Sequence, residues 1–239
     1  MHIGIRYFDL RVCRTINASI VKRSPFTFTH GLRGGLVRDG LEEINEFLNR
    51  HPQEIVLLDF IHFYDFNEEY GHEQLIELIH EIFSEKICTT AKTVSDCTLN
   101  YLWRNKQQVI LLYNQKRDQC SAYMNRIGHF FQICQSPWPN TSNVDMLFRF
   151  LDEKVSQARS TTCLNVIQGQ ITPDSATIQN NPFSSLKNFA RETNQRLNQW
   201  LAACQRDPSL INGVNIVICD FATQQFANAV IQLNHQSRS

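Results

Sequence analysis

Residues 55–60 read Ile55-Val-Leu-Leu-Asp-Phe60, a run of branched apolar residues that contains a single acid. An apolar run of this length without polar alternation is typical of a parallel strand that is buried on both faces. Comparable runs recur along the chain. They predict strands at residues 3–12, 26–30, 55–60, 109–114, 164–171 and 214–221, with a weaker one near 130–134.

Amphipathic segments separate these runs and predict helices. Asp39 is positioned to cap a helix that carries Leu41, Ile44 and Leu48 on one face and ends before Pro52. Further apolar stripes predict helices over residues 75–83, 144–155, 183–204 and 226–233. Strand–helix alternation of this kind indicates an α/β fold in one domain, residues 1–239.

A closed (β/α) barrel is favoured over an open doubly wound sheet. The chain has only nine glycines and no GxGxxG turn of the dinucleotide-binding type. The strands counted above are fewer than a complete barrel needs. We therefore expect a barrel that is incomplete.

The composition excludes several classes of protein. With 23 basic and 23 acidic residues, the chain carries no excess charge for coating nucleic acid, so we expect no nucleic-acid partner. An apolar fraction of 42% supports a folded core, and no apolar run is long enough for a membrane span. The eight cysteines form no CxxC pair, which favours reduced thiols over a disulfide framework or a zinc site. A cytoplasmic protein is the expectation.

The opening strand carries ionic groups. Asp9 and Arg11 are two residues apart, so their side chains share one face of the strand, whereas Arg6 faces the other way unless the strand is irregular. Ionic groups on an inner face must pair with each other or hold an anion. A buried Asp–Arg bridge and an anion site are both open.

His30 ends the second strand and precedes a glycine, a position suited to proton transfer. Together with Asp9 and Arg11 it supplies the groups that phosphate chemistry needs: a proton donor, a carboxylate to orient it and a guanidinium to neutralise a phosphoryl oxygen.

Three further residues stand out in apolar strands. Asp59 and Asp220 each follow a run of buried aliphatics, where packing explains an acid poorly, although a helix cap or a buried network remains an alternative. Tyr113 is either a pocket wall or a core aromatic.

These residues lie within motifs that resemble a known family, the X domain of phosphatidylinositol-specific phospholipase C, as found in animal X-domain-containing proteins and bacterial single-domain enzymes. The dense part of the likeness covers residues 3–66, with Gly4-Ile-Arg-Tyr-Phe-Asp-Leu-Arg11, Thr29-His30-Gly31, 40–48 and 51–60, and a looser part continues through 138–141, 167–173 and 215–221.

The resemblance implies a distorted (β/α) barrel and cleavage of phosphatidylinositol to diacylglycerol and an inositol phosphate, through attack of the inositol 2-hydroxyl on phosphorus. By motif, His30 matches the general acid, Asp9 the carboxylate that orients it, and Arg11 the arginine on the phosphate. Asp220 matches the last-strand aspartate that orients the family's first histidine. Because calcium-dependent members have a carboxylate where Arg11 stands, the resemblance implies that no metal cofactor is used.

The substrate-binding set carried over is Arg6, Asp59 and Tyr113, and an ungapped alignment puts Ile61 where bacterial enzymes have an inositol-contacting lysine. The family's first histidine would lie upstream of Gly4. Only three residues precede Gly4, so we expect a barrel that lacks its first strand and a chain that is weakly active.

Two alternatives remain open: a non-catalytic module that binds a phosphoinositide headgroup, and a metal-dependent phosphodiesterase of another barrel class, which Arg11 disfavours. The expected partner is phosphatidylinositol or a related lipid, with transient membrane contact and no indication of oligomeric state. Four aromatics are candidates for that contact, although core positions are favoured for them: Phe63, Tyr64, Phe66 and Trp138.

Overall fold

The computed structural model describes residues 3–15, 24–66, 69–91, 93–114, 134–157, 162–207, 210 and 213–235. These residues divide into two compact units. The first unit holds the described residues from 6 to 114, and the second holds residues 3–5 with those from 134 to 235. The weak strand expected near 130–134 falls mostly outside the described residues, and the assignment of 1–239 to one domain stays a prediction.

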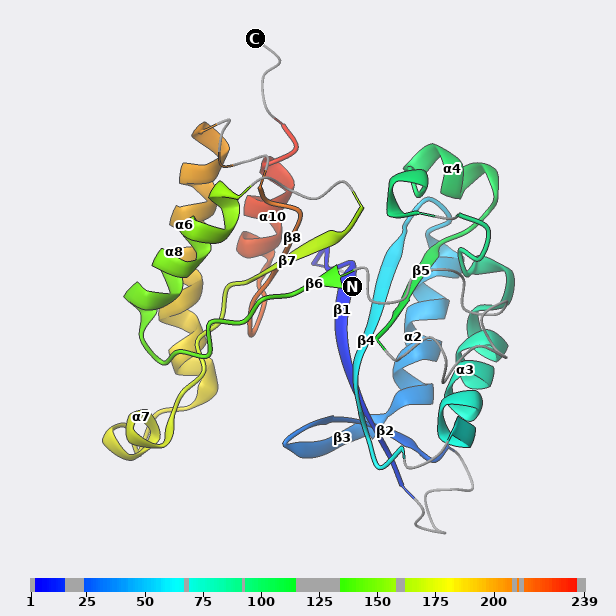
Figure 1. Cartoon of the computed structure of the whole chain (residues 1–239), viewed down its shortest axis with the longest axis horizontal. Helices are drawn as coiled ribbons and strands as arrows, with labels where there is room; N and C mark the ends of the chain where they lie inside the picture. The colour runs from blue at the N-terminus through cyan, green and yellow to red at the C-terminus, as the bar shows by residue number, and fades with distance from the viewer. Residues whose placement is uncertain are drawn as a thin grey trace. The chain divides into compact units, whose positions relative to one another are not determined.

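The first unit is built on a five-stranded sheet with the order β3-β2-β1-β4-β5 (Figure 1). The strands are β1 (Tyr7–Arg14), β2 (Phe26–His30), β3 (Leu32–Leu36), β4 (Val56–Tyr64) and β5 (Val109–Tyr113). Strands β1, β4 and β5 run parallel, whereas β2 is antiparallel to both β1 and β3. The sheet is therefore mixed, with an antiparallel hairpin at one edge.

Two helices, α2 (Val37–Arg50) and α3 (Glu69–Phe83), cover one face of this sheet (Figure 1). Their apolar stripes pack on side chains from the parallel strands, including the fully buried Val56 and Leu58. The shorter elements η1 (Ser84–Lys86), η2 (Val94–Asp96) and α4 (Leu99–Arg104) follow. The core of this unit lies between the sheet and α2 and α3, as the periodicity of the sequence predicts.

The structure corrects several boundaries in this unit. The first strand begins at Tyr7 rather than at residue 3, and β4 extends four residues beyond Phe60. Helix α2 begins at Val37, and its N-cap residue Leu36 makes no side-chain capping bond. The expectation that Asp39 caps this helix was wrong, because Asp39 lies within the first turn, where its charge still favours the positive end of the helix.

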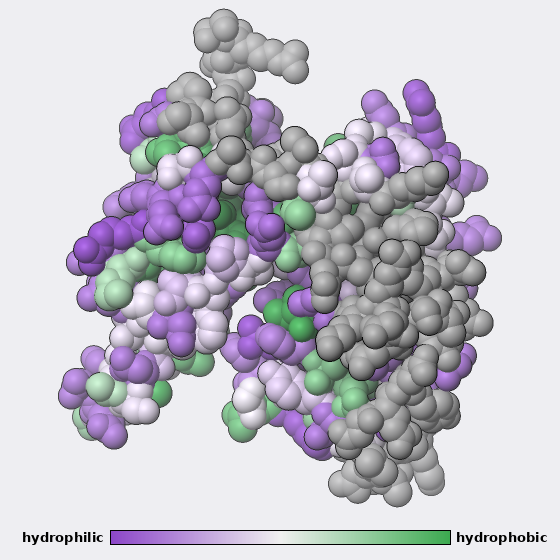
Figure 2. All heavy atoms as spheres, in the orientation of Figure 1, coloured by the Kyte–Doolittle hydropathy of each residue, from purple (hydrophilic) through white to green (hydrophobic). Residues whose placement is uncertain are grey.

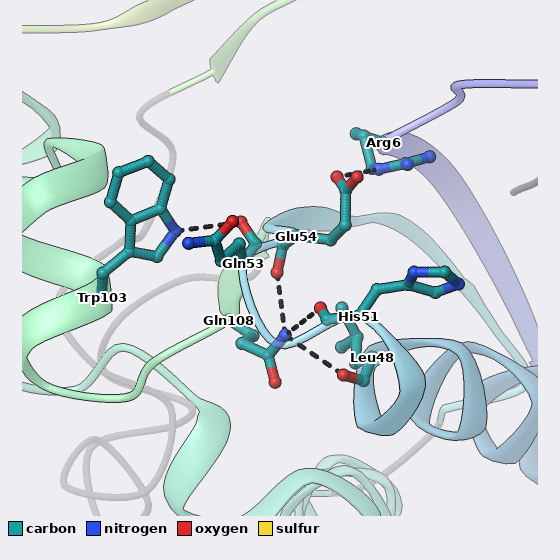
Figure 3. Close-up of polar contacts among 7 residues, drawn as sticks. All are labelled: Arg6, Leu48, His51, Gln53, Glu54, Trp103 and Gln108. Atoms are coloured by element: carbon teal, nitrogen blue, oxygen red, sulfur yellow. Dashed lines mark hydrogen bonds and ion pairs between the residues drawn. The ribbon is translucent and has the colours of Figure 1, made fainter.

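A buried glutamine joins α2 to the sheet. The Gln108 side-chain amide donates to the backbone carbonyls of His51 and Glu54, both at 3.0 Å, and more weakly to that of Leu48 at 3.4 Å (Figure 3). These carbonyls lie at the C-terminal end of α2 and in the turn before β4, and those of Leu48 and His51 each also accept a backbone N–H from three residues further on. Gln108 therefore fixes the exit of the helix to the start of β5.

The second unit contains three parallel strands in the order β6-β7-β8. They are β6 (Cys134–Gln135), β7 (Leu164–Gln168) and β8 (Ile216–Ile218). Helices α6 (Val144–Ser156), α8 (Leu186–Arg206) and α10 (Gln224–Gln232) pack their apolar faces with β7 and β8 around Leu147, Leu197 and Leu201. A one-and-a-half-turn helix, α7 (Ser175–Asn180), lies between β7 and α8.

Two strands of this unit are shorter than the sequence predicted, and one helix begins later. Strand β7 ends at Gln168, and β8 spans only three residues. Phe183 does not join the apolar face of α8, since its side chain is 98% exposed. The helix begins instead at Leu186, after Ser185, whose hydroxyl accepts from the Asn188 N–H.

The described chain is thus an α/β protein with one mixed and one parallel sheet, neither of which closes into a barrel by itself. Across the described helices, none is both long and apolar enough to span a bilayer.

Candidate phosphate site on the polar face of the first sheet

Strand β1 divides its side chains between the two faces of the sheet. Leu10 and Val12 are buried in the core beneath α2 and α3. By alternation, Tyr7, Asp9 and Arg11 lie on the opposite face, which α2 and α3 do not cover. We call this the polar face. It collects the titratable groups that the core excludes.

Asp9 and Arg11 form an ion pair on the polar face. Arg11 Nε lies 3.5 Å from Asp9 Oδ1, and the two side chains are 29% and 20% exposed. Burial raises the pKa of Asp9 above its usual value, against the opposing effect of Arg11. The predicted sharing of one face is confirmed. The bridge is present, and the exposed part of the guanidinium leaves it accessible to an incoming anion.

His30 ends β2 and is exposed. The antiparallel pairing of β2 with β1 runs from Arg14 opposite Phe26 to Val12 opposite Phe28, and His30 lies two residues beyond it at the end of β2. The positive charge of a protonated His30 would favour the Asp9 carboxylate, in the same direction as Arg11. The structure therefore brings together the three residues that the sequence singled out first.

A second histidine, His62, belongs to the same cluster and was assigned no role from the sequence. The pairing of β1 with β4 shifts by one residue after Leu10, so that Leu10 pairs with Phe60 but Arg11 pairs with His62. Ile61 is the extra residue of this bulge. His62 thereby shares the face of Arg11, is exposed, and acts on the Asp9 carboxylate in the same direction as His30.

The bulge falls at Ile61, the residue that an ungapped alignment places at the inositol-contacting lysine of bacterial enzymes, and that match stays a prediction. That residue takes the irregular position between the two registers, while His62 occupies the paired position on the polar face. The signal in the sequence was weak, because a bulge depends on the pairing of two strands and not on either strand alone.

Asp59 lies in the buried network that was the alternative to a site role. Its side chain accepts a hydrogen bond of 2.6 Å from the Tyr7 hydroxyl, and the residue is only 2% exposed. The register pairs Asp59 with Asp9 across the two strands. Asp59 therefore adjoins the cluster, and its role as a substrate contact stays a prediction.

Arg6 and Tyr113 lie elsewhere. Arg6 precedes β1 and donates from Nε to Glu54 at 2.7 Å (Figure 3). Its guanidinium also lies over the ring of Phe47. This ion pair lowers the pKa of Glu54. The structure thus gives Arg6 a structural pairing at the start of the strand, away from Arg11.

Tyr113 is 1% exposed and belongs to the core on the helix-covered face. Its hydroxyl is 2.9 Å from Nδ1 of His72 on α3. Of the two possibilities that the sequence left open, the structure supports the core aromatic. It does not bring Tyr113 to the polar face.

Asp220 belongs to the second unit and follows β8 in an exposed turn. Its backbone carbonyl accepts from the side-chain amide of Asn194 at 2.8 Å. Asp220 lines a small pocket with Gly169, Gln170 and Phe189, at the ends of β7 and β8. Its predicted role in orienting a histidine stays a prediction.

No group of three or more His, Cys, Asp or Glu side chains that could hold a metal occurs in the part of the chain that the structure describes. The candidate membrane aromatics divide into two pairs. Phe63 and Phe66 pack against the core as favoured, whereas Tyr64 and Trp138 are 46% and 53% exposed, so a core position was wrong for these two.

Sequence comparison identifies close relatives of this chain, although no protein-family profile matches it. It is 33% identical over 239 residues to PI-PLC X domain-containing protein 3 of Homo sapiens, covering 97% of this chain and 69% of the relative. It is 36% identical to PI-PLC X domain-containing protein 2 of Mus musculus, covering 98% and 66%. The chain belongs to the PI-PLC X domain-containing protein family.

Solved structures agree with this membership at the level of fold. The phosphatidylinositol-specific phospholipase C from Listeria monocytogenes superposes with a TM-score of 0.65 at 16% identity, over 98% of this chain and 80% of that one. A Staphylococcus aureus phosphatidylinositol-specific phospholipase C superposes with a TM-score of 0.63 at 13% identity, over 95% and 80%. The family is therefore phospholipase-like, and its α/β fold is that of these enzymes.

Proposed function

We propose that this X domain protein is a phosphodiesterase that cleaves phosphatidylinositol or a related lipid to diacylglycerol and an inositol phosphate. The observation that carries the proposal is the Asp9–Arg11 ion pair on the polar face, with His30 close enough for its charge to act on the Asp9 carboxylate. Family membership and the fold of the bacterial phospholipases support it. The finer fold, a distorted barrel lacking its first strand, belongs to the same proposal.

In this proposal each member of the cluster has a distinct task. Arg11 neutralises a phosphoryl oxygen, for which its planar, permanently charged fork is well suited. His30 donates a proton to the departing diacylglycerol oxygen, and Asp9 orients its imidazole. The guanidinium supplies the positive charge that a metal would otherwise provide, so the reaction is proposed to proceed without a metal cofactor.

His62 extends this set. It lies on the same face as Arg11 and acts on the same carboxylate as His30, so two imidazoles border the ion pair. Cleavage of a phosphodiester by a neighbouring hydroxyl needs one group to accept a proton and another to donate one. We assign the accepting role to His62.

Contact with the lipid surface is proposed to be transient and made by exposed apolar side chains at a cytoplasmic membrane face. Figure 2 shows hydrophobic residues at the surface where Figure 1 places α7. In and after this helix Ile178, Phe183 and Leu186 are 56%, 98% and 61% exposed. The indole N–H of Trp138 donates a hydrogen bond to the hydroxyl of Thr172, which precedes α7 in the sequence. Exposed aromatics and aliphatics of this kind favour an interface with one apolar side.

The test is hydrolysis of phosphatidylinositol vesicles by the full chain with a chelator present, followed by phosphorus NMR of the released inositol phosphate. We expect Arg11→Ala to reduce turnover by about 100-fold or more. Arg50→Ala is the matched control, because Arg50 forms an exposed ion pair with Glu46 on α2, far along the sequence from the cluster. Equal turnover by the Arg11 and Arg50 variants would contradict the proposal.

The same experiment separates the enzyme from a binding module. A polar face that holds an inositol phosphate without cleaving it would give vesicle binding that depends on Arg11 but no product. That outcome would replace the catalytic proposal with the headgroup-binding alternative. Folded protein that neither binds nor cleaves would exclude both.

A further inference from the structure

Two cysteines of the first unit face each other outside the polar face. The sulfur atoms of Cys88 and Cys97 are 3.8 Å apart, and one donates its S–H to the other. Cys88 is fully buried, whereas Cys97 is partly exposed. The two cysteines are nine positions apart in the sequence, so bringing their sulfurs together closes only a short loop.

The backbone holds both ends of this loop. The Cys88 N–H donates to the carbonyl of Val109 on β5 at 2.8 Å, which anchors it to the sheet edge. Cys97 precedes Thr98, the residue that caps helix α4 through its side chain. The closeness of the sulfurs is therefore set by a strand on one side and a helix start on the other.

The loop between them is also internally bonded. The Asp96 carboxylate accepts from both the N–H and the hydroxyl of Thr93, and the Cys97 sulfur donates to the Thr93 carbonyl at 3.7 Å. This turn keeps the Cys97 side chain directed into the loop. A disulfide between them requires the sulfurs to approach from 3.8 Å to about 2.0 Å.

The contact favours one thiolate at neutral pH. The contact between the two sulfurs lowers the pKa of Cys88 and raises the pKa of Cys97, because only one of the two readily carries a negative charge. The thiolate is the reactive form of cysteine. Elsewhere burial, together with neighbouring aspartates, raises the pKa of Cys204 to about 11 and that of Cys219 to about 12.

We propose that Cys88 and Cys97 are an oxidation site at which a hydroperoxide produces an intrachain disulfide. The Cys97 thiol passes its proton to the adjacent Cys88 thiolate, and the partly exposed Cys97 sulfur attacks the terminal oxygen of the peroxide and becomes a sulfenic acid. The O–O bond breaks, and the hydroxide or alkoxide that is released takes the proton from Cys88 and leaves as water or an alcohol, which restores the Cys88 thiolate. The Cys88 thiolate then attacks the Cys97 sulfur. The S–S bond forms, the S–O bond breaks, and the oxygen leaves as water with one proton from solvent.

The inference does not depend on the phospholipase proposal, because neither cysteine lies on the polar face. The disulfide would tie the edge of the sheet beside β5 to the start of α4. Its formation consumes two thiols and leaves the remaining six of the eight cysteines reduced.

The test is treatment of the full chain with a small excess of hydrogen peroxide, followed by alkylation of free thiols, proteolysis and mass spectrometry. We expect a peptide linking Cys88 to Cys97, with about 2 Da less than the sum of the reduced peptides, and its loss on treatment with dithiothreitol. Thiol titration of the same sample should show two thiols lost per chain.

Matched variants make the assignment specific. Cys97→Ser should abolish the linked peptide, whereas Cys204→Ser, at a buried cysteine on α8, should leave it unchanged. The mapping of the unmodified chain decides the case if a variant fails to fold. Sulfinic acid at either cysteine without the linkage, or a disulfide that joins other cysteines first, would overturn the proposal.

Discussion

Gln108 offers the sharpest test of how the first unit is held together. Its side-chain amide donates to three backbone carbonyls at 3.0, 3.0 and 3.4 Å, and the residue is 6% exposed (Figure 3). Gln108→Leu keeps the size of the side chain but removes the donor. The backbone of Gln108 still bonds to Val56 and Lys86, so the strand pairing around it is retained.

The expected cost follows from the bonds that are lost. Two well-formed hydrogen bonds and one weak one contribute about 2–3 kcal/mol together, at about 1 kcal/mol each. With a urea dependence of about 3 kcal/mol per molar, the unfolding midpoint should fall by roughly 1 M. The assay is urea unfolding followed by circular dichroism and tryptophan fluorescence.

The neighbouring Gln107 is a matched control. It is also 6% exposed, but its amide makes only a 3.4 Å contact with Thr90, and its side-chain oxygen has no hydrogen-bond partner in the described structure. Gln107→Leu removes little and relieves a buried polar oxygen, so its midpoint should change by less than about 0.2 M. Equal losses for the two variants would refute the role given to Gln108.

Three further outcomes are expected. The pKa of buried His72 is lowered from 6.5 to about 4 by desolvation, so the unfolded state binds the proton first and stability is lost as pH falls through that window. Between about pH 7.5 and about pH 4.5, the unfolding free energy of the parent should fall by up to roughly 3 kcal/mol more than that of His72→Phe. Equal decreases in the two proteins would contradict the assignment. Tyr7→Phe removes the 2.6 Å bond to the buried Asp59 carboxyl and should cost about 2 kcal/mol, whereas Tyr64→Phe, at an exposed tyrosine, should cost almost nothing. His62→Asn should reduce phosphatidylinositol hydrolysis by about 100-fold with the circular dichroism spectrum unchanged, and full activity would remove His62 from the proposed mechanism.

The buried parallel strands could be predicted because burial on both faces leaves a direct trace in sequence. The run at 55–60 and the run at 109–114 both appear as strands of the first unit. The β3 strand could not be predicted in this way. Its sequence, Leu32-Arg-Gly-Gly-Leu36, has low intrinsic strand preference and depends on antiparallel pairing with β2.

The same distinction applies to the candidate site. The shared face of Asp9 and Arg11 follows from simple alternation within one strand, and the ion pair confirms it. The position of Tyr113 depends on which face of the sheet the helices cover, and that of His62 depends on the register between two strands. Neither of these is visible in a single stretch of sequence.

The extra residue at Ile61 shifts the alternation of side chains along β4 by one position. Up to Phe60 the even-numbered residues of β4 point into the core. After Ile61 the odd-numbered residues do so, with His62 outward and Phe63 inward. A regular register with Ile61 opposite Arg11 would turn His62 into the apolar core and Phe63 onto the polar face, and the bulge prevents this. Deletion of Ile61 would remove the bulge and leave both side chains on their present faces. A relative that is one residue shorter at this point should therefore pair the two strands in a regular register and still carry the residue after Phe60 on the polar face.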